Sequence, residues 1–290
     1  MQIALALIPV AGLLAFIYFN DKKEKEPVGL LVSLFFAGMS TAIPAFFAEV
    51  IGELIINLVL PGESMIKAVI IASCLVAPAE EMGKYLILRA FTWKNKHFDY
   101  SYDAIVYAVF TSLGFAAIEN IGYVFSHGIG TAILRMFTAV PGHACFAVFM
   151  GYFYSKAKYA QITNDARSYS ACNVLSLVAP IFLHGVYDAI VMAGGATDSL
   201  ILSGLSLLLW GGFVFVMIGS SCLLVIYAAK NDFCFVRMPD NSWTYYSPAV
   251  AGNWQCACGK LNQLNFCGNC GSPRGRRWSD LQSMYGGRQD

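Results

Sequence analysis

Charged residues are scarce in this sequence. Asp, Glu, Lys and Arg make up only 13% of its 290 residues, whereas apolar residues make up 57%. An ordinary soluble domain carries roughly 25% charged residues, so this composition excludes that class. Alternation of polar and apolar residues, the pattern of strands, is also absent, and the apolar runs are interpreted as helices. The composition therefore predicts a helical integral membrane protein.

Several familiar protease signatures are missing as well. The chain has no H-E-x-x-H zincin motif, no Ser-His-Asp pattern and no paired intramembrane aspartates of the presenilin kind. Lys and Arg are also missing before the first apolar run, so we expect that run to be a retained helix and not a cleaved signal peptide. Any catalysis must come from a different set of side chains.

Long apolar runs recur along the chain. A hydrocarbon core of about 30 Å requires about 20 residues per helix. Runs that suit this length are predicted at residues 3–19, 28–60, 65–93, 102–125, 131–155, 171–193 and 200–229. We therefore expect an all-α polytopic membrane protein, with about seven transmembrane helices in residues 1–230.

The basic residues are distributed unevenly between the predicted loops. Of the 19 Lys and Arg residues, all but Lys67, Lys84 and Arg135 fall on alternate loops or on the polar tail. Short cytoplasmic loops carry an excess of Lys and Arg. This distribution predicts a cell-membrane protein with its N-terminus outside and its C-terminus in the cytosol.

Polar side chains of catalytic type interrupt four of the predicted spans. A charged side chain at bilayer depth costs about 3 kcal/mol or more, so such residues need water, partners or a function. Glu80 and Lys84 stand four residues apart, as do His184 and Asp188, so each pair shares one helix face. The full set is Glu80, Glu81, Lys84, Glu119, Asn120, His143, His184 and Asp188.

The depth of these residues follows from the helical rise. At 1.5 Å per residue from the predicted cytosolic ends, Glu81 lies roughly 16 Å deep, His143 roughly 18 Å, His184 roughly 20 Å and Glu119 roughly 26 Å. Helix tilt decides whether Glu119 lies level with the others, and the sequence leaves this open. Glu49 and Glu53, at the far end of the second span, are predicted to face water on an interfacial extension.

This set suits the activation of water. Any one buried His or Glu is often a structural residue, but a converging set adds desolvation costs without a packing benefit. Two adjacent carboxylates beside a lysine allow one to act as a base while the other stays ion-paired or protonated. The histidines suit stabilisation of an oxyanion or ligation of a metal, and Asp188 is placed to orient His184.

Four motifs resemble those of the PrsW intramembrane proteases, which are related to the CAAX protease and Abi superfamily. They are Glu80-Glu81-x2-Lys84, Phe115-x3-Glu119-Asn120, His143-x7-Gly151 and His184-x3-Asp188, in this order. The resemblance implies an endopeptidase that cleaves single-pass or membrane-anchored proteins in or next to the lipid bilayer. It also implies that Glu80, Glu81, His143 and His184 are catalytic. Glu119 stands where the prenyl proteases have histidine, which makes prenylated substrates unlikely.

Two mechanisms remain open on the residues alone. In the preferred metal-free mechanism Glu80 is the base, Glu81 its partner and Lys84 their charge balance, with both histidines on the oxyanion side. The same four catalytic residues also suit a zinc-dependent mechanism with three protein ligands and one water. A proton- or ion-coupled transporter, which also uses buried acids, is a third reading, although no internal repeat supports it. A fourth is a membrane scaffold for the tail.

The tail is predicted to contain a separate module. Residues 231–252 are expected to be a linker, residues 253–273 a zinc ribbon, and residues 274–290 a basic, flexible tail. Four cysteines suit one structural zinc ion, because the predicted topology places them in the reducing cytosol. The pattern resembles the RanBP2-type zinc finger, which implies a cytosolic protein or RNA partner. The predicted ligands are Cys256, Cys258, Cys267 and Cys270.

Overall fold

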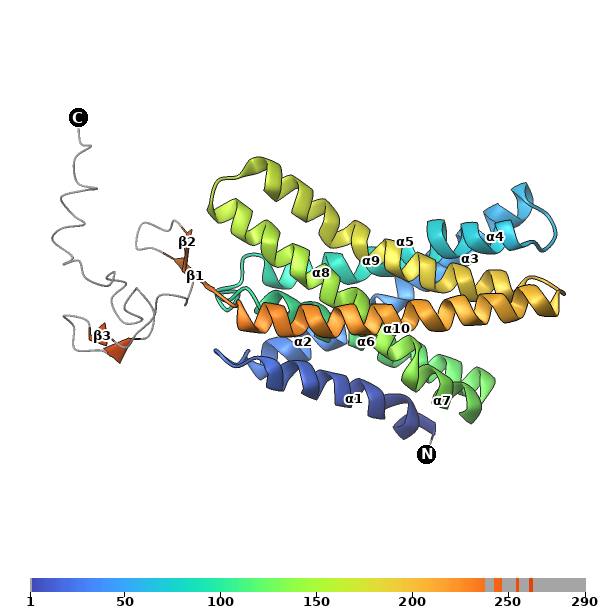
Figure 1. Ribbon diagram of the computed structural model, residues 1–290, viewed down its shortest axis with the longest axis horizontal. Coiled ribbons are helices and arrows are strands. Elements are labelled where there is room, and N and C mark those ends of the chain that lie inside the picture. Colours follow the sequence, from blue (N-terminus) through green and yellow to red (C-terminus); the bar gives the residue numbers. More distant parts are fainter. Residues whose placement is uncertain (1, 238–242, 247–253, 256–260, 263–290) are drawn as a thin grey trace.

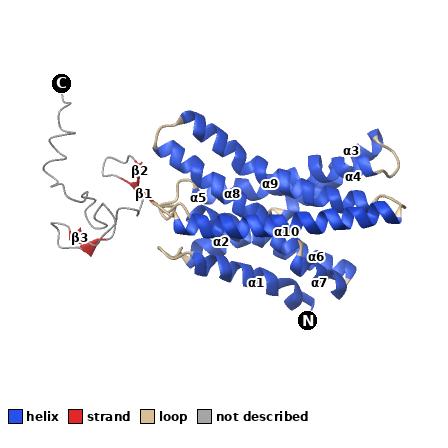
Figure 2. Ribbon diagram, viewed as in Figure 1, coloured by secondary structure: helices blue, strands red, loops and turns tan. Residues whose placement is uncertain are grey.

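The chain forms a bundle of helices that run mostly along its long axis (Figures 1 and 2). The computed structural model describes residues 2–237, 243–246, 254–255 and 261–262. In chain order the helices are α1 (Gln2–Asn20), α2 (Val28–Ser40), α3 (Ala42–Val59), α4 (Met65–Ile71), the π-helical turn η1 (Ala72–Val76), α5 (Ala77–Thr92), α6 (Asp103–His127), α7 (Ile129–Phe137), α8 (Ala139–Ile162), α9 (Ala166–Gly195) and α10 (Leu200–Lys230).

Five helical stretches of the described chain have the length and composition to cross a membrane. They cover residues 28–59, 103–127, 129–162, 166–195 and 200–230. Residues 65–92 are helical but carry the charged motif, and α1 is a shorter apolar helix. The prediction of a helical polytopic membrane protein is confirmed, while the number of seven spans stays a prediction.

Prolines explain two irregularities in the predicted spans. The second span breaks at Thr41, because Pro44 has no N–H to donate to the carbonyl of Ser40 and its ring crowds that carbonyl. Likewise Pro78 has no N–H for the carbonyl of Cys74, and η1 immediately precedes α5. Such π-helical turns often occur at functional sites. This one leads directly into the two glutamates.

Helix α6 is the centre of the bundle. It is buried along most of its length and packs against α1, α2, α5, α7 and α8. Glycines allow this close approach: a Cβ at Gly114 would lie 2.0 Å from the carbonyl oxygen of Phe35, and one at Gly38 would lie 2.0 Å from that of Thr111. Small residues at helix contacts are typical of membrane bundles. On α8, Gly151 of the third motif serves the same purpose against Ala104.

A short hairpin follows the last helix. Strand β1 (Cys234–Arg237) pairs antiparallel with β2 (Trp243–Tyr246), within the stretch predicted to be a linker. A bridge between Tyr100 and Cys234 and a hydrogen bond from Ser101 to Asp232 fix this hairpin to the loop between α5 and α6. The tail thus leaves from a defined position on the bundle.

Two further short strands lie in the predicted zinc ribbon. Strand β3 (Trp254–Gln255) pairs antiparallel with β4 (Leu261–Asn262). The four predicted zinc ligands, Cys256, Cys258, Cys267 and Cys270, lie outside the described residues.

Candidate active site

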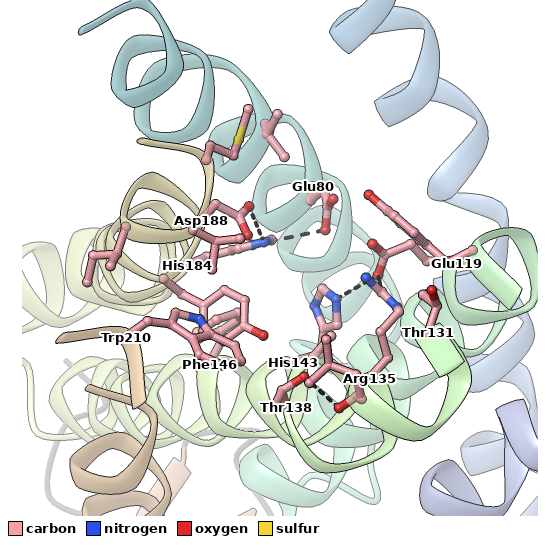
Figure 3. Close-up of a pocket in the computed structure, with 18 of the residues that line it drawn as sticks. Glu80, Glu119, Thr131, Arg135, Thr138, His143, Phe146, His184, Asp188 and Trp210 are labelled. Carbon is pink, nitrogen blue, oxygen red and sulfur yellow. Dashed lines mark hydrogen bonds and ion pairs between the residues drawn. The ribbon is translucent and has the colours of Figure 1, made fainter. Parts of the chain in front are cut away.

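Ionisable side chains from five helices meet inside the bundle (Figure 3). All the predicted site residues of the membrane domain except Asn120 contact one another there. Helix α5 supplies Glu80, Glu81 and Lys84, α6 supplies Glu119, α7 supplies Arg135, α8 supplies His143, and α9 supplies His184 and Asp188.

Lys84 connects the two glutamates to one histidine. Its fully buried ammonium lies 3.2 Å from Oε2 of Glu80 and 2.6 Å from Oε1 of Glu81. The same Nζ lies 3.2 Å from Nδ1 of His143 and 4.1 Å from the ring centroid of Phe115. An ammonium has only N–H groups to offer, so Nδ1 accepts and the imidazole proton of His143 lies on Nε2. One cation therefore balances both glutamates and fixes a tautomer.

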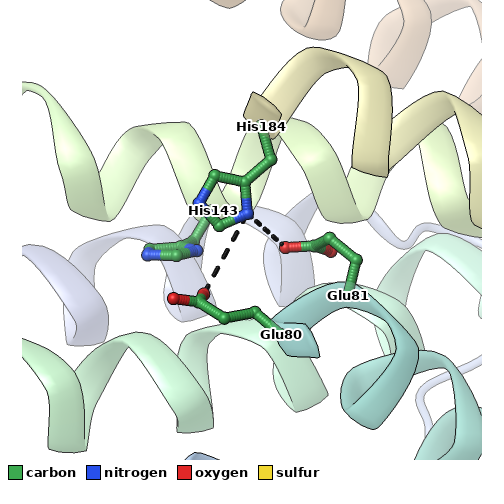
Figure 4. Close-up of side chains that lie close together, drawn as sticks. All are labelled: Glu80, Glu81, His143 and His184. Atoms are coloured by element: carbon green, nitrogen blue, oxygen red, sulfur yellow. Dashed lines mark hydrogen bonds and ion pairs between the residues drawn. The ribbon is translucent and has the colours of Figure 1, made fainter. Parts of the chain in front are cut away.

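His184 lies between two carboxylates. Its Nδ1 is 2.9 Å from Oε1 of Glu81 and 4.0 Å from Oε2 of Glu80. Figure 4 shows the ring facing both carboxylates. Its Nε2 is 3.1 Å from Oδ2 of Asp188, one helical turn further along α9. A neutral imidazole donates from one nitrogen only, so this geometry favours the doubly protonated ring. The ring also stacks on Phe146, with centroids 4.7 Å apart.

Glu119 lies level with His143. Its Oε2 is 2.8 Å from Nε2 of His143, which answers the question of depth that the sequence left open. The same oxygen is 2.9 Å from a guanidinium nitrogen of Arg135. Glu119 therefore orients the second nitrogen of the histidine and is itself held by a cation.

Arg135 is a site residue that sequence reasoning missed. The sequence marks it only as one of three basic residues outside the alternate loops and the tail, and the predicted span 131–155 does not separate α7 from α8. Besides Glu119, the guanidinium contacts Asn120 Oδ1 at 3.0 Å and covers the ring of Tyr123 at 3.9 Å. The amphipathic stretch 129–137 was the available signal, because a lone Arg on such a helix turns toward buried acids.

Asn120 supports the site from behind. Its Nδ2 donates to the main-chain carbonyl of Ala6 on α1, while its Oδ1 accepts from Arg135. It therefore links α1 to α7 and does not touch Glu80 or Glu81.

A cavity of about 910 Å³ opens beside these residues. Its walls are mainly apolar, with side chains such as Phe46, Phe115, Leu134, Tyr187 and Trp210. Glu80 lines this cavity, whereas Glu81 and Lys84 do not. A large apolar space beside a few convergent polar groups is the usual form of a ligand site. The other acidic and basic residues that line it are Glu49, Glu119, Arg135, His143, His184 and Asp188.

The position of Glu49 differs from the prediction made from the sequence. The sequence predicts that Glu49 and Glu53 both face water, and Glu53 is exposed on the surface of the bundle. Glu49 instead is half-buried and lines the cavity. Helix α3 restarts after the break at Thr41, and this restart decides which of its faces turns toward α5, η1 and the cavity. The sequence pattern did not show that restart.

Comparison with known proteins gives one consistent family. The profile of the PrsW family intramembrane metalloproteases matches residues 26–226. Protease PrsW of Geobacillus kaustophilus is 35% identical over 192 residues, which cover 66% of this chain and 80% of that protein. Protease PrsW of Oceanobacillus iheyensis is 34% identical over 206 residues, 70% of this chain and 88% of that protein. Protease PrsW of Bacillus subtilis is 35% identical over 191 residues, 66% and 83% of the two chains.

No solved structure matches this chain. The matched region contains every ionisable residue of the candidate site and all four motifs, so the sequence relationship includes the chemistry. These matches support a peptidase and do not support the transporter or scaffold readings. The chain belongs to the PrsW family and is an intramembrane protease.

Proposed function

We propose that the protein hydrolyses peptide bonds of membrane-anchored proteins in the cavity, with Glu80 as the general base. One observation carries the assignment: of the two adjacent glutamates, Glu80 lines the cavity, while Glu81 is fully buried behind it. A base must lie within hydrogen-bond reach of the water from which it removes a proton. Glu81 instead holds Lys84 and His184 in place.

The proposed reaction follows from this division of roles. Glu80 removes a proton from water, and the resulting hydroxide adds to the peptide carbonyl. His143 and His184 line the cavity beside Glu80, and we assign them to the oxyanion side. Carboxylates hold their N–H groups in the resting site, and one of these groups would have to turn to the developing oxyanion to stabilise the transition state. Glu80 then gives its proton to the leaving amine, so that base and acid are the same carboxyl group.

Zinc is the alternative that the family description suggests. Glu80, Glu81, His143 and His184 fit such an ion by donor type, since one ligand atom from each lies within 4.8 Å of the others. A zinc ion held by three of these residues, with the fourth position left to water, would polarise the carbonyl and lower the pKa of that water. The ammonium of Lys84, however, already contacts three of the four donors. This contact supports the metal-free mechanism.

Elemental analysis separates the two mechanisms. Full-length protein is compared with a double variant, Cys256→Ser with Cys267→Ser, which removes the proposed tail site. We expect one zinc per chain in the natural protein, none in the cysteine variant, and unchanged proteolysis in both. Zinc retained by the cysteine variant and lost with His184→Ala would identify a metalloprotease.

The activity itself is tested in proteoliposomes. Purified protein is mixed with a panel of single-pass membrane proteins, and cleavage products are identified by mass spectrometry. Products that disappear with Glu81→Gln and with His143→Ala support the proposal. Full cleavage in both variants would overturn it.

We also propose the topology and the role of the tail. The Lys and Arg distribution supports an N-terminus outside the cell and a cytosolic tail. The pairing of β3 with β4, between which two of the cysteines fall, suits a zinc ribbon. Such a module would dock a cytosolic protein or RNA. The orientation is tested with variants that each keep a single cysteine, which is labelled with a membrane-impermeant thiol reagent from either side of the membrane.

A further inference from the structure

Three carboxylates meet at the end of the bundle from which the tail leaves, outside the candidate active site. Asp21 follows α1, Glu26 precedes α2, and Asp103 is the first residue of α6. Figure 1 shows these loops gathered beside β1. The residues are only 3%, 4% and 1% exposed, and one carboxylate oxygen of each lies within 4.8 Å of the others. We call these three residues the acidic cluster.

Protein hydrogen bonds leave part of this cluster unsatisfied. Asp103 accepts two main-chain N–H groups through Oδ2, and Glu26 accepts the hydroxyl of Tyr107 through Oε2. Within residues 2–237, Oδ1 of Asp103 and Oδ2 of Asp21 are buried and accept no hydrogen bond from a donor group, although the carboxyl groups of Asp103 and Glu26 lie close enough to share a proton. The hydroxyl of Tyr102, beside Asp103 in the chain, is also buried and unpaired there. Buried polar atoms without partners are rare and call for an unseen water or ion.

Protein cations offset only part of the charge of the acidic cluster in the described part of the chain. Lys25 acts on Asp21 from a distance, but its ammonium is bound by the main-chain carbonyls of Tyr18 and Asp21 and forms no ion pair with the cluster. No Lys, Arg or His nitrogen in residues 2–237 forms an ion pair with any of the three carboxylates. Asp232, also buried, adds a further negative charge at this end. Several carboxylates buried without a counter-charge are strongly unfavourable.

We propose that the acidic cluster binds a hard divalent cation, Ca²⁺ or Mg²⁺. Its donors are all oxygens, which these ions prefer, whereas zinc and copper favour nitrogen and sulfur. Ligand oxygens around such ions stand about 3 to 5 Å apart, which the spacing of the cluster matches. The oxygens of Asp21 and Asp103 that accept no hydrogen bond from a donor group are free to act as ligands of the ion. The ion holds the loop between α1 and α2 onto the first turn of α6.

The alternative is that the carboxyl groups share protons and bind no ion. The two cases differ in their response to cations. In the first, millimolar Ca²⁺ or Mg²⁺ raises the unfolding temperature of the full-length protein. In the second, neither ion changes it.

Variants assign the effect to the acidic cluster. Thermal unfolding of purified full-length protein is followed in detergent with and without each ion. Asp21→Asn and Glu26→Gln should each raise the half-saturating concentration of the ion at least tenfold. Glu24→Gln, which removes an exposed carboxylate from the same loop, should leave it unchanged. The shift should also persist in Glu81→Gln, which excludes the candidate active site as its source.

A direct binding measurement on the natural protein tests the proposal even if a variant fails to fold. Tb³⁺ is a luminescent substitute for hard cations and is sensitised by nearby tyrosines, of which Tyr107 contacts Glu26. We expect stoichiometric Tb³⁺ emission from the natural protein, and competition by Ca²⁺ and Mg²⁺ identifies the preferred ion. Absence of a thermal shift together with absence of sensitised emission would overturn the proposal, as would equal shifts in the natural protein and both cluster variants.

Discussion

Arg135 and Glu119 form an ion pair of 2.9 Å that connects α7 to the histidine of α8. Glu119 in turn contacts Nε2 of His143 at 2.8 Å, so the guanidinium positions the histidine through the carboxylate. We expect Arg135→Gln to lower kcat by about tenfold with KM little changed, and Arg135→Lys to restore part of the loss. Arg167→Ala, at an exposed basic residue, is the control. A change confined to KM would argue against a positioning role.

Lys84 balances two buried glutamates, so its removal should destabilise the protein. Breaking a buried ion pair by removing one partner costs about 3–5 kcal/mol, because the remaining charge stays buried. We expect Lys84→Met to lower the unfolding temperature strongly. The double variant Lys84→Met with Glu81→Gln should recover part of the loss, since one uncompensated carboxylate is then gone. Thermal unfolding in detergent measures both, and a Lys84→Met protein as stable as the natural one would contradict the assigned balance.

Gly114 allows α6 to lie against α2. In Gly114→Ala the new Cβ would lie 2.0 Å from the carbonyl oxygen of Phe35, so the helices must separate. We expect a loss of about 3 kcal/mol in the free energy of unfolding. Gly122→Ala on the same helix is the matched control, because a Cβ there meets nothing within 4 Å. Equal stability of the two variants would show that the close contact between α2 and α6 is absent.

Glu49 lines the cavity, and no hydrogen bond or ion pair reaches its carboxylate from the described residues. It is therefore free to contact the substrate without holding the catalytic groups. We expect Glu49→Gln to change KM several-fold, and differently for different substrates, while kcat changes little. Initial rates over a range of substrate concentrations test this. A loss of kcat comparable to that of His143→Ala would instead place Glu49 in the catalytic machinery.

The sequence predicts the parts of this protein that depend on spacing along one helix. The pairs Glu80 with Lys84 and His184 with Asp188 share helix faces and contact each other as expected, because four residues make about one turn. The helical polytopic architecture likewise follows from composition and from the length of the apolar runs.

Relations between helices were harder to predict. The depth estimate left Glu119 well beyond His143, yet their side chains touch, because rise along an axis ignores tilt and side-chain reach. Arg135 was missed because its partner lies on another helix. Glu49 was misplaced because a break in the chain changed which face of α3 is buried. These features depend on how the helices pack against one another, and the sequence of a single helix does not determine that packing.

The central claim is that Glu80 removes the proton from water, and one comparison tests it most directly. Cleavage of a single-pass substrate is measured in proteoliposomes with the natural protein, with Glu80→Gln and with Glu53→Gln. Glu80→Gln keeps the size of the side chain but removes the base, whereas Glu53→Gln alters an exposed carboxylate. We predict that kcat falls by about 10³-fold or more for Glu80→Gln and stays unchanged for Glu53→Gln. A folded Glu80→Gln protein that cleaves at the natural rate would contradict the account.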